Sequence, residues 1–148
     1  MLHITQKMTK VIQYNDFSCF AACLESFLKD NNRPFDHQKF ILANLDVFHG
    51  GETIEGSCDS DSFAEVAKRI GLGFEHIQEF SKSKGITFSE PKETILFATY
   101  WQGEKSDKHC VRYYTEERGK WKVMNPKTGD FDYLDEDWIF RVYRVSAA

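Results

Sequence analysis

The sequence lacks the features of a membrane or secreted protein. No apolar run among its 148 residues approaches the roughly 20 residues that span a bilayer. The N-terminal stretch MLHITQKMTKVIQY contains no continuous apolar segment of the kind that signal peptides carry. We therefore expect cytoplasmic synthesis, no membrane span, and a signal-peptide-independent route if the protein is delivered to another cell.

Cysteine, proline and charge of one sign are also scarce. Four cysteines are too few for a disulfide scaffold, and three prolines in 148 residues argue against a low-complexity chain. The net charge of −4 is small and the lysines are scattered, so a nucleic-acid partner is not expected. The whole sequence is 41% hydrophobic and 15% aromatic, which is typical of one globular domain over residues 1–148.

Hydrophobic periodicity predicts three helices followed by a sheet. Helices are expected from Ser18 to about Lys29, from Asp36 to about Phe48, and from Ser60 or Asp61 to Gly71. Strands are expected within residues 74–80, 94–101, 109–116, 120–126 and 139–145. Turns at 115–121 and 125–131 join neighbouring antiparallel strands. This order of elements predicts an α+β fold with N-terminal helices packed on a C-terminal antiparallel sheet.

Cys19 is placed at the start of the first predicted helix, in the stretch QYNDFSCFAAC. A thiol becomes a nucleophile when it is partly thiolate, and the positive end of a helix and a nearby imidazole both favour that state. Packing in the core is the commoner fate of a cysteine, and we assign that role to Cys23 and Cys110. Cys58 is expected in an exposed loop.

Three further residues complete a candidate site around Cys19. Gln13 has a neutral amide that can stabilise an oxyanion beside the Cys19 backbone N–H. His109 begins one predicted strand and Asn125 ends the next, with the hairpin turn near Arg118 and Gly119. The two side chains should therefore meet at one end of the hairpin, where Asn125 can orient His109 toward a thiol.

In these motifs the sequence resembles the papain-like cysteine peptidases, and in its compactness the bacteriocin-leader peptidases of family 39. Such domains carry a Gln, five residues, the nucleophilic Cys and a second Cys one helical turn later, and then a His and an Asp or Asn before a Gly-containing turn. The matching residues are Gln13, Cys19, Ala22, Cys23, His109, Val111, Asn125, Pro126 and Gly129. The resemblance implies a papain-like fold, a Cys19–His109–Asn125 triad, Gln13 in the oxyanion hole, and a protein or peptide substrate.

Two departures from the leader peptidases qualify the resemblance. Phe20 stands where those enzymes usually have Gly after the nucleophile, which predicts an altered rim of the substrate cleft and argues against a double-glycine leader as substrate. Asn125 replaces the usual Asp. The compact scaffold is also that of bacterial effector deamidases, which convert a Gln side chain on a protein partner to Glu. A peptidase, a deamidase or transglutaminase, and a catalytically silent binding module thus remain open.

Other cysteines, histidines and loops allow competing interpretations. A zinc site from Cys19, Cys23 and His109 lacks the paired spacing of structural zinc sites, so we expect no metal and no cofactor. Among the other histidines, His37 is expected to be solvated and His49 competes with His109 as the base. The loops at 49–60 and 81–92 are expected to line or cover the site. The sequence gives no indication of the oligomeric state.

Overall fold

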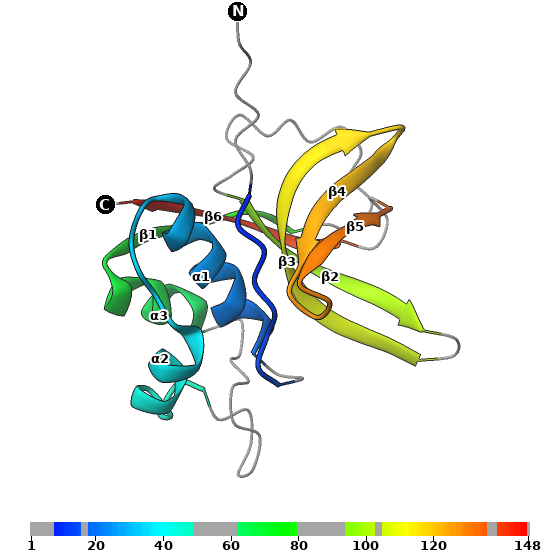
Figure 1. Ribbon diagram of the computed structural model, residues 1–148. Coiled ribbons are helices and arrows are strands. Elements are labelled where there is room, and N and C mark those ends of the chain that lie inside the picture. Colours follow the sequence, from blue (N-terminus) through cyan, green and yellow to red (C-terminus); the bar gives the residue numbers. More distant parts are fainter. Residues whose placement is uncertain are drawn as a thin grey trace, which may run out of the picture.

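The computed structural model describes residues 8–15, 18–48, 62–79, 94–102, 105–135 and 139–147 (Figure 1). Within these ranges the helices are α1 (Cys19–Asp30), α2 (His37–Ala43) and α3 (Phe63–Ile70). The strands are β1 (Leu72–Glu79), β2 (Thr94–Gln102), β3 (Lys105–Glu117), β4 (Lys120–Asn125), β5 (Asp130–Leu134) and β6 (Ile139–Ala147). The predicted α+β fold, with helices before an antiparallel sheet, is confirmed.

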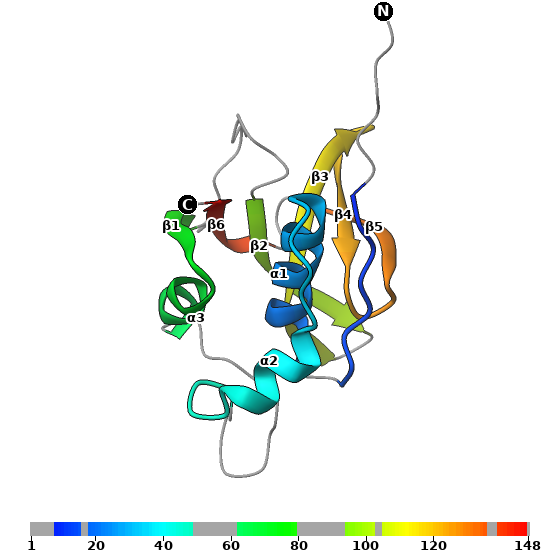
Figure 2. The same ribbon diagram turned by 60° about the vertical axis from the view of Figure 1, so that its left-hand side comes forward.

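The strands form one six-stranded sheet in the order β1-β6-β2-β3-β4-β5, and the pairs are antiparallel. The helices lie together on one side of the sheet, with α1 on β3 and α3 on β1 (Figures 1 and 2). The segment that precedes α1 runs between this helix and the β4–β5 hairpin. The start of α1 therefore lies close to strands that come about 90 residues later in the chain.

The helices begin largely where the sequence predicts, but α2 is shorter. Asp36 caps α2 by accepting a hydrogen bond from Lys39 N–H at 3.1 Å, as expected. The helix ends at Ala43 instead of continuing to Phe48, and Leu45, which lies beyond that end, is 46% exposed. Asn44 terminates α2 through hydrogen bonds to its last turn, because its side chain donates to Phe40 O at 2.8 Å.

The strands also match, with two differences. β3 begins at Lys105, so His109 lies inside a long strand and does not begin one. The cause is that β2 and β3 pair as far as Gln102 and Lys105, across residues expected to form a loop. β5 was not predicted as a strand, since its sequence DFDYL contains two aspartates, but it pairs with β4 along its whole length.

Phe20 lies in the hydrophobic core, and the expectation that it forms the rim of a cleft is wrong. Its side chain is 3% exposed and stacks on Phe63, with ring centroids 3.8 Å apart and an interplanar angle of 14°. Phe74 contacts both rings edge-on. The reason is the helical period: with Cys19 turned toward β3, the next position of α1 faces α3 and β1. Phe20 therefore carries no information about the substrate.

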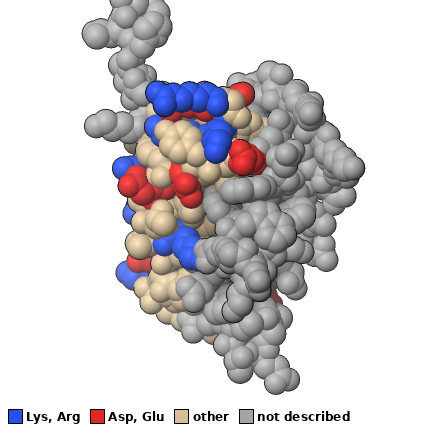
Figure 3. Space-filling view, turned by 90° about the vertical axis from the view of Figure 1, so that its right-hand side faces the viewer, with Lys and Arg blue, Asp and Glu red and all other residues tan. Residues whose placement is uncertain are grey.

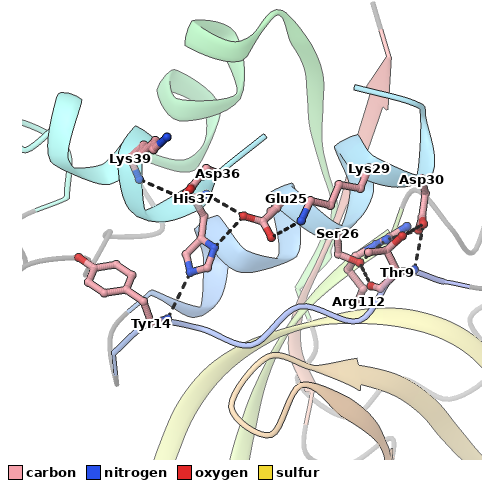
Figure 4. Close-up of polar contacts among 10 residues, drawn as sticks. All are labelled: Thr9, Tyr14, Glu25, Ser26, Lys29, Asp30, Asp36, His37, Lys39 and Arg112. Carbon is pink, nitrogen blue, oxygen red and sulfur yellow. Dashed lines mark hydrogen bonds and ion pairs between the residues drawn. The ribbon is translucent and has the colours of Figure 1, made fainter. Parts of the chain in front are cut away.

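A buried ion pair fastens α1 to the sheet. Arg112 on β3 is fully buried, and its Nη1 donates to Asp30 Oδ2 and to Ser26 Oγ, both at 2.6 Å (Figure 4). Asp30 also accepts from Thr9 N–H at 2.9 Å and from the Thr9 hydroxyl. Burial lowers the pKa of Arg112 and the Asp30 carboxylate opposes that shift. This network joins β3, the C-terminal end of α1 and the N-terminal segment.

The surface carries charges of both signs. On the face shown in Figure 3, Lys and Arg atoms alternate with Asp and Glu atoms over the described residues. Ion pairs among the described residues include Lys10 with Asp130 at 2.9 Å. The described residues on that face therefore form no surface of a single charge sign, in line with the small net charge.

Candidate functional site

Cys19 is the first residue of α1, as the sequence predicts, and is partly exposed. Ser18 occupies the N-cap position, but its hydroxyl hydrogen-bonds to Asn15 N–H at 3.3 Å and to Asn15 O at 3.2 Å. Ser18 makes no side-chain capping bond to the helix. Its hydroxyl therefore leaves the N–H groups of the first turn available, and their partial positive charge favours a thiolate at Cys19.

The pKa of the Cys19 thiol lies well below its ordinary value of 9.0. The strongest cause is a hydrogen bond from the Cys110 side chain, and burial opposes it by raising the pKa. His109 then lowers the pKa through a hydrogen bond and its charge, and the Cys110 backbone N–H contributes from 3.5 Å. Cys19 therefore has the environment of a thiolate held beside an imidazole.

His109 and Asn125 meet as the sequence predicts. His109 is 6% exposed and Asn125 is 4% exposed, and His109 Nε2 lies 2.6 Å from Asn125 Oδ1. The hairpin between β3 and β4 turns at Arg118 and Gly119, both with positive φ, so the two side chains reach the same end of the strand pair. Because an amide oxygen only accepts, Nε2 carries the ring proton, and Nδ1 is the nitrogen left for Cys19.

The turn after β4 fixes the orientation of Asn125. Its Oδ1 also accepts from Lys127 N–H at 3.0 Å, and its Nδ2 lies 3.4 Å from Asp132 Oδ2. Gly129 in this turn has φ +68°, and a Cβ built there would stand 3.1 Å from the Ile12 side chain. A side chain at position 129 would thus be strained and would press on the segment before α1.

Gln13 lies beside this turn. Its backbone N–H donates to Pro126 O at 2.8 Å, which places it next to the residue that follows Asn125. The side-chain Oε1 of Gln13 is buried and has no hydrogen-bond partner among the described residues. A buried amide oxygen without a partner costs about 1–3 kcal/mol, so such groups in folded proteins call for an explanation.

The other cysteines and histidines are placed as follows. Cys23 is fully buried in the core, as expected, and burial raises its pKa. Cys110 is 1% exposed and belongs to the core, but its contact with Cys19 was not foreseen, since alternation along β3 only indicated that it faces away from His109. Cys58, His49 and the whole of the loops at 49–60 and 81–92 lie outside the described residues.

The expectation that His37 is solvated is wrong. The residue is 6% exposed, and its ring lies between Glu25 of α1 and the backbone of Tyr14. Its position in the first turn of α2 suggested exposure, but α2 packs this turn against α1. The sequence signal that could have identified the contact is Glu25, a charged residue on the apolar face of an otherwise buried helix.

Neither a membrane helix nor a metal site is found in the described part of the chain. None of its helices has the length and apolarity to cross a bilayer. Within the same residues, no group of three or more His, Cys, Asp and Glu side chains is arranged to hold a metal ion.

Comparison with known proteins adds a structural relationship. No protein-family model matches the sequence, and no curated protein matches it. The fold is similar to the peptidase domain of Streptococcus ComA, a bifunctional ABC transporter involved in quorum sensing. The TM-score is 0.67 at 13% identity, over 96% of this chain and 100% of that domain.

A second similar structure is a double-glycine-motif protease from an AMS/PCAT transporter, solved in complex with the leader peptide. The TM-score is 0.66 at 11% identity, over 97% of this chain and 94% of that one. The chain has the fold of these peptidase domains. The predicted α+β fold, with helices packed on an antiparallel sheet, is thereby confirmed as the fold of these two peptidase domains.

Proposed function

We propose that residues 1–148 form a single cysteine-dependent amide hydrolase domain that acts as a peptidase. The proposal is supported by one chain of contacts: Cys19 at the start of α1, His109 beside it, and Asn125 at 2.6 Å from the far nitrogen of that ring. The similarity of the fold to two peptidase domains agrees with it.

In the proposed mechanism, His109 Nδ1 takes the proton of the Cys19 thiol, and Sγ attacks the carbonyl carbon of the substrate amide. The Cys19 backbone N–H and the Gln13 amide stabilise the resulting oxyanion. His109 returns the proton to the leaving nitrogen as the C–N bond breaks, which leaves a thioester on Cys19. Water, deprotonated by His109, hydrolyses the thioester and restores the thiol. Asn125 keeps the ring in the required tautomer throughout.

Peptidase activity is tested with a peptide pool that includes peptides with an internal Gly-Gly, because one similar structure is a double-glycine-motif protease. Mass spectrometry should find new peptide ends with the wild-type protein and none with Cys19→Ala, while both proteins unfold at similar temperatures. Activity retained by Cys19→Ala would refute the role of this thiol. A gain of about one dalton at a Gln side chain without cleavage would indicate a deamidase instead.

A second measurement needs no substrate. Iodoacetamide alkylates thiolates, so Cys19 should react faster than free N-acetylcysteine at pH 7. If Cys19 reacts no faster than the free thiol and no peptide is cleaved, the chain is a binding module that keeps the fold.

A further inference from the structure

Glu25, His37 and Tyr14 form a hydrogen-bonded chain that the triad does not use (Figure 4). Glu25 Oε1 accepts from the His37 backbone N–H at 2.8 Å and lies 3.0 Å from His37 Nδ1. On the other side of the ring, Nε2 accepts from Tyr14 N–H at 3.2 Å. The chain joins α1, α2 and the segment that precedes α1.

The hydrogen bonds define the state of the His37 ring. A backbone N–H can only donate, so Nε2 carries no proton and Nδ1 donates its proton to Glu25. Glu25 is 7% exposed, and its second oxygen accepts from Lys29 Nζ at 3.0 Å. Burial raises the pKa of Glu25, but the hydrogen bonds from His37 and Lys29 bring it below its ordinary value. The carboxylate therefore holds the ring in the tautomer that Tyr14 requires.

This chain ends one residue from Gln13. Tyr14 N–H is held by His37, and Gln13 N–H is held by Pro126 O at 2.8 Å. Two consecutive backbone N–H groups are thus bound from different sides. His37 of α2 binds that of Tyr14, and the turn after Asn125 binds that of Gln13. Glu25 belongs to the helix that begins at Cys19, so the same helix carries the thiol and supports the segment that carries Gln13.

We propose that His37, oriented by Glu25, is a positioning residue that keeps the Gln13 amide at the oxyanion of the reaction. The proposal rests on the function proposed above for Cys19 and Gln13. His37 does not touch the reacting atoms, and it acts through the backbone of residues 13 and 14. Its loss should therefore weaken steps that form an oxyanion and leave the reactivity of the thiolate itself unchanged.

Two reagents separate these effects. p-Nitrophenyl acetate acylates Cys19 through a tetrahedral oxyanion, whereas iodoacetamide alkylates it by direct displacement without one. The ratio of the two rates at Cys19, followed by the mass of the proteolytic fragment that contains Cys19, reports on the oxyanion site. Loss of one oxyanion donor commonly costs about 10²–10³ in rate, so Gln13→Ala sets the full effect.

Two substitutions of His37 form a matched pair. His37→Asn can still donate to Glu25 from the position of Nδ1 but cannot accept from Tyr14. His37→Gln can place its amide oxygen near the position of Nε2 and accept from Tyr14. We expect His37→Asn to lower the acylation-to-alkylation ratio about tenfold or more, which is a part of the effect of Gln13→Ala. We expect His37→Gln to retain most of the wild-type ratio. Equal ratios in both variants, or a larger loss in His37→Gln, would overturn the proposal.

Two further measurements distinguish positioning from a general loss of stability. In a Gln13→Ala background, His37→Asn should have no further effect, because the two residues act in series. Asp36→Ala removes the cap of α2 without touching Tyr14 and should leave the ratio unchanged. The role of His37 would be contradicted if His37→Asn lowered the acylation-to-alkylation ratio as much in the Gln13→Ala background as in the wild-type protein. It would also be contradicted if Asp36→Ala lowered this ratio as much as His37→Asn does. If the wild-type protein is not acylated at Cys19 at all, the proposed function itself fails.

Discussion

Asn125 offers the most direct test of the site, because its amide contacts His109 through Oδ1 and Asp132 through Nδ2, and both contacts can be altered by substitution. Asn125→Ala leaves the His109 Nε2–H group without the acceptor that stands at 2.6 Å. The ring is then free to rotate or to take the other tautomer, which turns its basic nitrogen away from Cys19. We expect slower alkylation of Cys19 by iodoacetamide and slower acylation by p-nitrophenyl acetate.

The magnitude follows from the burial of the two groups. His109 is 6% exposed, so its unpaired N–H costs about 1–3 kcal/mol. If this cost of about 1–3 kcal/mol is the free energy that holds the His109 ring in place, the rates of alkylation and acylation at Cys19 should fall by about 5- to 150-fold. The melting temperature should fall by about 2–4 °C for each kcal/mol lost.

The control is Asn125→Asp, which keeps the Oδ1 oxygen that accepts from His109 and from the Lys127 N–H. This change places a carboxylate where Nδ2 lies 3.4 Å from Asp132 Oδ2, and the two negative charges repel. Asn125→Asp combined with Asp132→Asn removes the repulsion and should recover most of the rate. The measurement is the rate of Cys19 labelling by intact mass, beside the melting temperature of each variant. Wild-type labelling in a destabilised Asn125→Ala protein would refute the orienting role, because Asn125 would then serve only the turn.

Three other predictions concern the surroundings of the site. Asp30→Asn removes the charge opposite buried Arg112 and should lower the free energy of unfolding by about 3–5 kcal/mol in urea, whereas a change below 1 kcal/mol would show that the pair is not needed. Phe20→Ala should cost about 3–5 kcal/mol by leaving a cavity beside Phe63, and peptide cleavage sites should not change; a changed cleavage site would place Phe20 at the substrate after all. Because the folded-state pKa of Glu25 is lowered, its contribution to stability is complete above its ordinary value of 4.5 and is lost as the pH falls below it. Between neutral and acidic pH, the free energy of unfolding of Glu25→Gln should therefore fall less than that of the wild-type protein. An equal fall in both proteins, measured by urea denaturation at each pH, would contradict this sign.

Much of the fold could be predicted from local patterns. The helix starting at Cys19, the Asp36 cap and the Gly71 terminus follow from residues within one or two turns, because capping and periodicity are local properties. The meeting of His109 and Asn125 was predictable for the same reason, since one tight hairpin fixes the register between them.

What the sequence could not provide depends on packing between distant segments. Phe20 and His37 were both placed at the surface, and both are buried by elements that the pattern of their own helix does not reveal. The contact of Cys110 with Cys19 depends on how deep α1 sits on β3. Neither periodicity nor spacing within one element reports the position of a neighbouring layer.

The separation of the site along the chain has a consequence for folding. Cys19 and its hydrogen-bond partner Cys110 are 91 residues apart, and Gln13 is held by a carbonyl beyond Asn125. Contacts of such long range form only after the entropy of closing large loops has been overcome. During synthesis, α1 can form early, but its thiol keeps ordinary reactivity until β3 and β4 have been made and have docked. In the proposed mechanism, the nucleophile therefore reaches its activated state only after most of the fold has formed.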